Sequence, residues 1–335
     1  MKGVVIGMVM GVFTMSAANS LAQPADRTVL VVHGGAGAEA KEAMTPAKEK
    51  AYRDGLERAL QAGRTALLKP GGTSLDAVEA ALVVLEDDPL FNAGRGAAFN
   101  REGRHELNAS IMDGQTRKAG AIAGVSRVKN PICAARAVME KSPHVFLIGE
   151  GAERFARDEG LTMVSPLYFW TEPRWNDMKA AEAKAAGKTA SRGSEASHFG
   201  TVGAVALDAK GNLAAGTSTG GITYVMPGRV GDSPIIGAGT IADNATCGVS
   251  CTGIGELFIR HSVAHDIAAR VKYKGETIAV AAQAALDGLP KRPDGVGGII
   301  ALDPAGNHAF AFNTNGMYRG SITQAGITKI AIYEK

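Results

Sequence analysis

The sequence predicts a mixed α/β fold in which two sheets are covered by helices, a four-layer α/β sandwich. Two observations predict it. First, 45% of the 335 residues are hydrophobic, so the chain can bury a large core. Second, strand-like and helix-like segments occur on both sides of a polar stretch at 171–199. We therefore expect two packed sheets within a single domain over 23–335.

The elements before this stretch follow from periodicity and from their end signals. Thr73, with Asp76 three residues later, has the pattern of a capping box and predicts the start of a helix that reaches Leu85. Pro131 stands where a helix tolerates proline, in its first turn. The other predicted helices cover 43–68, 131–140 and 149–160, and the predicted strands cover 28–32, 110–114, 119–128 and 144–148, the last of a buried type.

The polar stretch is rich in Lys, Ala, Glu, Ser and Gly. It predicts a linker, part helical and part disordered, because it cannot bury enough apolar surface to order itself. Loops of this length inside one core are usually functional or disordered. The linker ends at Gly200-Thr201, where a β-branched strand begins, and cleavage at this boundary would give the linker a function.

The elements after the linker are two hairpins separated by two helices. The first hairpin joins strands at 202–207 and 212–219 through a turn at 208–211. The remaining predicted elements are helices at 256–273 and 276–289 and a hairpin at 297–302 and 308–313.

The N-terminus has a basic start at Lys2, an uncharged apolar run over 4–15 and a small-x-small site at Ser20-Leu21-Ala22. This pattern predicts a signal peptide over 1–22 and hence a periplasmic or secreted protein. The apolar run is shorter than the roughly 20 residues that a membrane anchor needs. Removing Lys2 from the 36 basic residues leaves 35 against 33 acidic ones, a balance that does not indicate nucleic-acid binding.

The cysteines and histidines do not predict a metal site or a disulfide framework. Cys133, Cys247 and Cys251 are odd in number and lack zinc-finger spacing, so we expect free, buried thiols. His261 and His265 are four residues apart, but the segment lacks the glutamate of a metalloprotease helix. The acidic loop that begins at Glu86 suggests a solvated turn.

Cleavage before Thr201 would create a self-contained nucleophile. A free threonine α-amine has a reference pKa of roughly 7.7–8.0, so it could act as a base toward its own hydroxyl. Gly200 suits the cut because glycine tolerates a strained backbone at the scissile bond. The alternative interpretation is that Thr201 is an ordinary β-branched residue at the start of a strand.

Downstream segments could bind an amino-acid substrate. Arg229 and Asp232 lie three residues apart in a tight turn, and they match the carboxylate and ammonium of an α-amino acid. Alternatively they form an ion pair that stabilises their own loop. The segment 250–256 leads into a helix whose free N–H groups could stabilise an oxyanion, or could serve only as a helix cap.

Seven motifs, taken in order, resemble those of the plant-type asparaginases, or isoaspartyl peptidases, a family of N-terminal-nucleophile hydrolases. The resemblance covers about 28–332. The motifs are His33-Gly34-Gly35-Ala36-Gly37, Phe91-Asn92-Ala93-Gly94, Met112-Asp113-Gly114, Gly200-Thr201-Val202-Gly203-Ala204-Val205, Thr217-Ser218-Thr219-Gly220-Gly221, Pro227-Gly228-Arg229-Val230-Gly231-Asp232 and Ser250-Cys251-Thr252-Gly253.

The resemblance implies an αββα fold and a precursor that cuts itself between Gly200 and Thr201. The products would be an α chain, 23–200, with a flexible linker over 171–200, and a β chain, 201–335. They would assemble as a dimer of α/β heterodimers. The family acts on small-molecule or dipeptide substrates without a catalytic metal or organic cofactor.

The resemblance also implies a role for each matched residue. Thr201 would be the nucleophile, Thr219 a hydroxyl beside it, and Asn92 the residue that orients it. The implied oxyanion hole is Thr252 and Gly253, and the implied substrate-binding residues are Arg229 for the α-carboxylate, Asp232 for the α-amine, Gly253 and Gly255. A structural sodium ion would be held by backbone carbonyls of Leu85, Glu86, Asp88, Phe91, Ala93 and Arg95.

Two segments depart from the family pattern. Asn108 stands where an acidic residue is expected, and the stretch 165–197 is individual to this chain, so the trimming of the linker is not predicted. We expect an enzyme that hydrolyses isoaspartyl dipeptides and L-asparagine. The alternatives are a glycosylasparaginase-like amidase, in which the cut would follow an aspartate and not Gly200, and a non-catalytic periplasmic amino-acid-binding protein.

Overall fold

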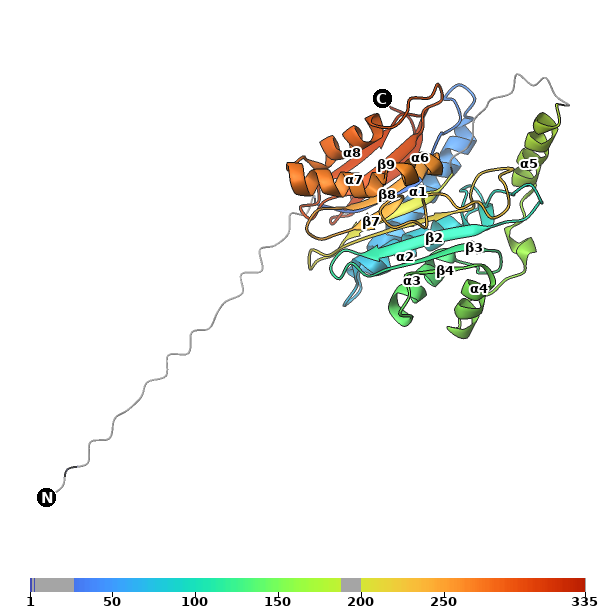
Figure 1. Ribbon diagram of the computed structural model, residues 1–335. Coiled ribbons are helices and arrows are strands. Elements are labelled where there is room, and N and C mark those ends of the chain that lie inside the picture. The colour runs from blue at the N-terminus through green and yellow to red at the C-terminus, as the bar shows by residue number, and fades with distance from the viewer. Residues whose placement is uncertain (2, 4–26, 188–199, 335) are drawn as a thin grey trace.

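The computed structural model describes residues 1, 3, 27–187 and 200–334 (Figure 1). The predicted signal peptide lies outside the described residues except for Met1 and Gly3, and so does the end of the predicted linker, 188–199. The described chain is a mixed α/β structure with one eight-stranded and one four-stranded sheet. No helix in these described parts has the length and apolar composition needed to cross a bilayer.

The eight-stranded sheet carries the strands on both sides of the predicted cleavage boundary. Its order is β12-β11-β1-β5-β6-β2-β3-β4, and only the β3–β4 pair is parallel. The strands are β1 (Thr28–Ala36), β2 (Leu107–Asp113), β3 (Ala119–Val125), β4 (Phe146–Ile148), β5 (Val202–Leu207), β6 (Leu213–Thr219), β11 (Met317–Thr323) and β12 (Thr328–Ala331).

The four-stranded sheet is antiparallel and has the order β10-β9-β8-β7. Its strands are β7 (Thr240–Ala242), β8 (Gly248–Gly253), β9 (Gly297–Leu302) and β10 (His308–Phe312). This sheet packs against the eight-stranded one, with β8 and β9 facing β5 and β1. Apolar side chains from both sheets, such as Val31 and Val205 opposite Val249, form one buried cluster.

Helices cover the outer faces of both sheets (Figure 1). On the eight-stranded sheet lie α1 (Pro46–Leu68), α2 (Ser74–Asp87) and α3 (Pro131–Lys141). On the four-stranded sheet lie α7 (Val263–Ala269) and α8 (Ile278–Asp287). The remaining helices are α4 (Gly149–Asp158), α5 (Glu172–Ala185), α6 (Gly255–Arg260) and the single-turn elements 94–96, 166–169 and 270–274.

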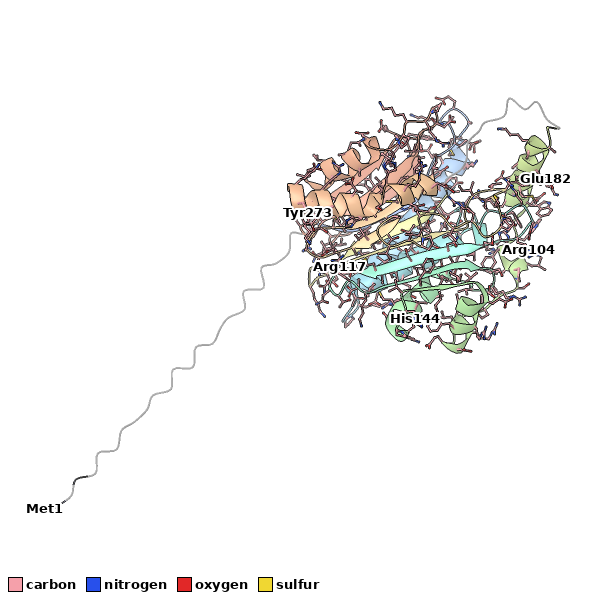
Figure 2. The ribbon with its side chains drawn as sticks, in the orientation of Figure 1. Met1, Arg104, Arg117, His144, Glu182 and Tyr273 are labelled. Carbon is pink, nitrogen blue, oxygen red and sulfur yellow. The ribbon has the colours of Figure 1, made fainter. Side chains whose placement is uncertain are left out.

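Local signals explain where several helices begin. The predicted capping box is present: Thr73 and Asp76 exchange side-chain and backbone hydrogen bonds at the start of α2. The Thr45 side chain caps α1 by accepting the backbone N–H of Lys48, and Pro46 occupies the first turn of this helix. Leu56 and Leu60 of α1 and Leu82 and Leu85 of α2 are fully buried, whereas Arg104, Arg117 and Tyr273 lie at the periphery (Figure 2).

Three predictions about single elements were wrong. The strand at 144–148 is not of a buried type: β4 is an edge strand, and Phe146 and Ile148 are exposed. The helix predicted at 256–273 is broken, because Ser262 adopts a left-handed conformation between α6 and α7. Glu86 is fully buried and not part of a solvated turn.

Two further predictions were right in part. The start of the predicted linker is the regular helix α5, whose Met178 is buried. Among the cysteines, Cys247 and Cys251 are free and buried, whereas Cys133 is free but partly exposed.

Candidate active site

Thr201 lies at the start of β5 and is almost completely buried. The register of β5 and β6 pairs Val202 with Ser218, which brings Thr201 beside Thr219. The Thr201 hydroxyl donates a hydrogen bond to Oγ1 of Thr219 at 3.1 Å. Thr219 also accepts the backbone N–H of Gly221 at 3.1 Å, so its hydroxyl is held in one orientation toward Thr201.

Asn92 connects the residue before Thr201 with the end of β6. Its backbone N–H donates to the carbonyl oxygen of Gly200 at 3.1 Å, and its own carbonyl accepts the N–H of Gly220 at 3.0 Å. Its side chain donates to the carbonyl of Gly221 at 2.7 Å. A Cβ at position 200 would lie only 2.4 Å from the Cβ of Asn92, so only glycine fits in this contact.

Arg229 belongs to a second group of side chains. Its Nε and Nη2 donate to the two carboxylate oxygens of Glu256, both at 2.9 Å, in a bidentate pair. The guanidinium fits closely between two glycines, because a Cβ at Gly231 or Gly255 would lie 2.7 or 2.8 Å from its nitrogens. Glu256 therefore fixes the orientation of Arg229, and Nη1 is the nitrogen that this pair does not engage.

Asp232 is buried in the same loop and has an unsatisfied oxygen. Its Oδ2 has no hydrogen-bond partner among the described residues. Burial raises the pKa of Asp232 to about 7, and the nearby Arg229 opposes part of that rise. A buried carboxylate oxygen without a donor fits a ligand that brings its own, such as an ammonium group.

Thr252 and Gly253 end β8. The Thr252 hydroxyl accepts the backbone N–H of Ala36 at 3.3 Å, which ties β8 to the end of β1. The neighbouring Cys251 N–H donates to the carbonyl of Gly239. A Cβ at Gly239 would lie 2.9 Å from Asp232, so the end of β8 lies close to the Asp232 carboxylate.

A chain of buried side chains links five strands between the two sheets. Its members are His33, Ser250, Thr217, Thr240 and Ser110, all fully buried. Successive hydrogen bonds measure 3.0, 2.6, 2.6 and 2.8 Å. Burial lowers the pKa of His33 to about 3, so the whole chain is neutral at physiological pH.

This hydroxyl chain joins the strands of the two groups. At one end, His33 pairs across the sheet with Gly203, two residues after Thr201. At the other end, the Ser110 hydroxyl donates to the carbonyl of Ser233 at 2.6 Å, next to Asp232. The chain therefore holds the loop that carries Asp232 in a fixed position relative to the strand that carries Thr201.

The loop between α2 and the turn at 94–96 gathers backbone carbonyls. A Cβ at Gly94 would lie 2.3 Å from the carbonyl oxygen of Glu86, and one at Gly96 would lie 2.0 Å from that of Phe91. Backbone carbonyls are ligands of hard cations, and three of the six predicted ones, those of Asp88, Phe91 and Ala93, already accept backbone N–H groups. Within the described chain, His, Cys, Asp and Glu side chains do not gather in threes as a metal site, and this includes His261 and His265.

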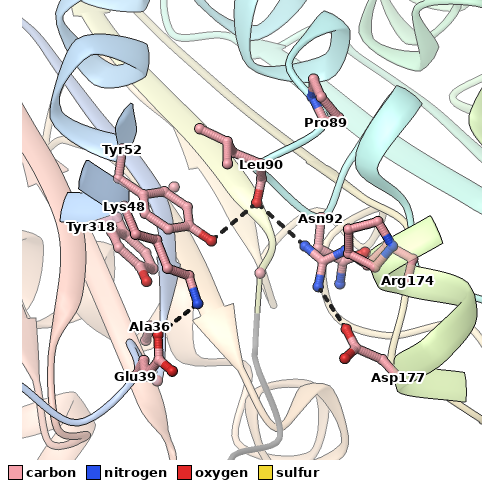
Figure 3. A pocket seen from close by; sticks show the side chains of 14 residues that line it. Ala36, Glu39, Lys48, Tyr52, Pro89, Leu90, Asn92, Arg174, Asp177 and Tyr318 are labelled. Atoms are coloured by element: carbon pink, nitrogen blue, oxygen red, sulfur yellow. Dashed lines mark hydrogen bonds and ion pairs between the residues drawn. The ribbon is translucent and has the colours of Figure 1, made fainter. Parts of the chain in front are cut away.

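A pocket of about 370 Å³ borders Gly200 and Asn92 (Figure 3). Lys48 forms an ion pair with Glu39 at 2.6 Å on one side of it, and Arg174 lies 3.7 Å from Asp177 on the other. None of the 14 residues that line this pocket lies between 201 and 317, so it is separate from the group around Arg229.

The structure brings together the residues that the sequence indicated, in two adjoining groups. Thr201, Thr219, Asn92 and Gly200 form the first, and Arg229, Asp232, Gly255 and the Thr252-Gly253 segment form the second. The Asn108 side chain accepts the Gly124 N–H and donates to the Glu106 carbonyl, and Asn108 pairs with Thr219 in the register of β2 and β6.

Sequence reasoning missed the role of Glu256 and the hydroxyl chain. Glu256 follows Gly255 directly. It lies 27 residues after Arg229, and no local sequence pattern indicates that two residues so far apart form an ion pair. Three of the five chain members, His33, Thr217 and Ser250, do lie within motifs that the sequence singled out.

Comparisons with known proteins agree with this arrangement. A sequence model of a family described as asparaginase matches residues 26–332. The chain is 50% identical over 300 residues to an isoaspartyl peptidase of Salmonella typhimurium, covering 88% of this chain and 95% of that protein. It is 50% identical over 297 residues to an isoaspartyl peptidase of Escherichia coli, with 88% and 92% coverage. A human isoaspartyl peptidase/L-asparaginase is 42% identical over 290 residues, with 86% and 91% coverage.

Proposed function

The chain belongs to the asparaginase family, and from this membership and the site geometry we propose that it is a self-processing hydrolase of isoaspartyl dipeptides and L-asparagine. The observation that carries the proposal is the convergence at the predicted cleavage boundary. There, Thr201 contacts Thr219 while Asn92 donates to the carbonyl of Gly200. The nucleophilic hydroxyl of Thr201 and the N–H that donates to the scissile carbonyl thus lie on either side of the Gly200–Thr201 bond.

Self-cleavage would begin with attack of Thr201 Oγ on the carbonyl carbon of Gly200. The Asn92 N–H, already 3.1 Å from that carbonyl oxygen, would stabilise the developing negative charge. The C–N bond then breaks, the Thr201 nitrogen takes up the hydroxyl proton, and an ester joins Gly200 to Oγ. Water hydrolyses this ester and leaves a Gly200 carboxylate and a free Thr201 α-amine.

The freed α-amine would serve as the base of the mature enzyme. It accepts the hydroxyl proton while Thr201 Oγ attacks the side-chain carbonyl of the substrate. The amide nitrogen takes up that proton and leaves as ammonia or an amino acid. Water then hydrolyses the β-aspartyl ester and releases aspartate. The hydroxyl of Thr252 and the N–H of Gly253 are the proposed oxyanion donors.

Substrate recognition would use the second group. Arg229 Nη1 is positioned by Glu256 to bind the α-carboxylate, and Asp232, whose Oδ2 is unsatisfied, binds the α-amine. Gly253 and Gly255 line this part of the site, because side chains there would collide with neighbouring backbone or with Arg229. L-asparagine and isoaspartyl dipeptides present the same aspartyl group to these residues.

The proposal extends to the fold type, a bound ion, the assembly and the location of the protein. The two packed sheets with outer helices support the αββα sandwich of N-terminal-nucleophile hydrolases. Family membership supports a structural sodium ion at the backbone carbonyls of the 85–95 loop and a dimer of α/β heterodimers. The N-terminal pattern over 1–22 supports export to the periplasm or medium.

The proposed activity is tested by aspartate release. Wild-type protein, Thr201→Ala and Thr201→Ser are incubated with an isoaspartyl dipeptide and with L-asparagine. We expect turnover by the wild type, partial activity of Thr201→Ser, which keeps a hydroxyl nucleophile, and none of Thr201→Ala. Equal turnover by Thr201→Ala would contradict the assignment, and ligand binding without turnover by the wild type would favour the binding-protein alternative.

A further inference from the structure

The pocket beside Gly200 has the position of a site for the leaving group. A substrate bound to Arg229 and Asp232 places its reactive carbonyl at Thr201, and its leaving amide must point away from that loop. Gly200 and Asn92, which adjoin the reacting position, line the pocket, whereas the 229–256 region contributes no residue to it. The end of β1 borders both regions, since Ala36 lines the pocket and its N–H donates to Thr252.

The pocket contains one cation that can be redirected to a ligand. Arg174 is already engaged: its Nε donates to the Gly96 carbonyl at 2.8 Å, its Nη2 to the Leu90 carbonyl at 3.4 Å, and its Nη1 faces Asp177. Among the described residues the Lys48 ammonium pairs with Glu39 alone, and the two side chains are 44% and 29% exposed, respectively. A half-exposed pair of this kind contributes little stability, so Lys48 can exchange Glu39 for another carboxylate at small cost.

Next to Lys48, one wall of the pocket is aromatic. The rings of Tyr52 and Tyr318 stack with centroids 4.1 Å apart and an angle of 23° between their planes (Figure 3). A flat aromatic surface beside a cation suits an amino acid with a free α-carboxylate and an apolar side chain. The leaving group of an isoaspartyl dipeptide is an amino acid with a free α-carboxylate, and it is apolar in a dipeptide such as isoaspartyl-leucine, whereas the leaving group of L-asparagine is ammonia.

We propose that this pocket is the leaving-group subsite for isoaspartyl dipeptides, in which Lys48 binds the C-terminal carboxylate of the substrate. The inference rests on the proposed function and adds to it the part of the substrate beyond the scissile amide. Glu39 competes with the substrate for Lys48, so the Lys48–Glu39 pair sets the preference for dipeptides over L-asparagine.

The test compares three substrates with four proteins. The substrates are an isoaspartyl-leucine dipeptide, the same dipeptide with its C-terminus amidated, and L-asparagine. The proteins are the wild type, Lys48→Gln, Glu39→Gln and, as a control, Lys50→Gln. Lys50 lies on the same helix, pairs with Asp54 at the surface and does not line the pocket.

We expect Lys48→Gln to lower the ratio of kcat/KM for the free dipeptide to kcat/KM for L-asparagine roughly fivefold, the scale of a partly exposed ion pair. In this variant the free and amidated dipeptides should become equivalent. Glu39→Gln should raise the same ratio, and Lys50→Gln should leave it within twofold of the wild type.

Unchanged ratios in Lys48→Gln and Glu39→Gln, with both substrates hydrolysed, would overturn the subsite but leave the proposed function standing. Absence of turnover with every substrate in the wild type would instead overturn the proposed function. A wild type that does not distinguish free from amidated dipeptide would also overturn the subsite.

Discussion

Replacing Gly200 with alanine tests whether the Gly200–Asn92 contact drives self-cleavage. The new Cβ would lie 2.4 Å from the Cβ of Asn92, whereas carbon atoms pack at about 3.5–4.0 Å. The backbone at position 200 must therefore move by about 1 Å or more, which takes the Gly200 carbonyl out of hydrogen-bonding range of the Asn92 N–H, now at 3.1 Å.

Loss of one donor to a developing oxyanion slows a reaction by roughly 10²–10³-fold, and we expect Gly200→Ala to slow self-cleavage on that scale. The overpacking should also lower the free energy of unfolding by about 1–3 kcal/mol. The rate is measured as the appearance of the 201–335 chain on a denaturing gel, and Tm reports the stability. Gly151→Ala is the control, since a Cβ there meets nothing within 4 Å. Cleavage of Gly200→Ala at the wild-type rate would refute the reasoning.

Two other predictions concern the hydroxyl chain and Asp232. Thr217→Val keeps the shape of the side chain but leaves its buried hydrogen-bond partners unsatisfied, so we expect the free energy of unfolding to fall by about 1–3 kcal/mol and KM to rise. Thr217→Ser should restore both quantities. The control is Thr246→Val, which removes a buried hydroxyl outside the chain and should not raise KM. If Thr217→Val alters stability alone, the positioning role is wrong. Because the pKa of Asp232 is raised to about 7, substrate binding below that pH must expel a proton, and KM should rise as pH falls from 7 to 5 while kcat is unaffected by this group. Because the pKa is raised in the folded state, protonated Asp232 stabilises the fold, and this contribution to stability is lost as pH rises through 7. A KM that does not change with pH would contradict the role of Asp232.

Local sequence signals were sufficient for much of the fold. The Thr73 and Asp76 pattern located the start of α2, and the turn at 208–211 located the β5–β6 hairpin, because both depend on neighbouring residues. The strands β7, β8, β11 and β12 were not predicted. β7 has three residues and β8 has glycine at both ends, so neither shows the alternation that marks a strand.

Long-range contacts could not be predicted from the sequence. Glu86 stands before two aspartates and a proline, yet its carboxyl accepts the Ser218 hydroxyl at 2.6 Å and the Ile132 N–H at 3.0 Å. Burial raises its pKa to about 8. Its environment is created by a strand 132 residues away, so no local pattern distinguishes it from a solvated acid.

The same limit applies to the candidate site. Thr201 was identified because a strand begins abruptly after a polar segment, and Arg229 and Asp232 because their charges lie in one turn. The hydroxyl chain was missed because its members come from five strands and meet only when the two sheets pack. The pairing of Arg229 with Glu256 likewise depends on how α6 docks against the 227–232 loop.

Identification of the chains in the purified protein tests the central claim most directly. The full-length gene is expressed, and the product is resolved on a denaturing gel with N-terminal sequencing and intact mass of each band. We predict two chains, with the smaller one beginning at Thr201 and ending at Lys335, and a single uncut chain for Thr201→Ala. A wild type that remains one chain, or that is cut at a bond other than Gly200–Thr201, would contradict the account.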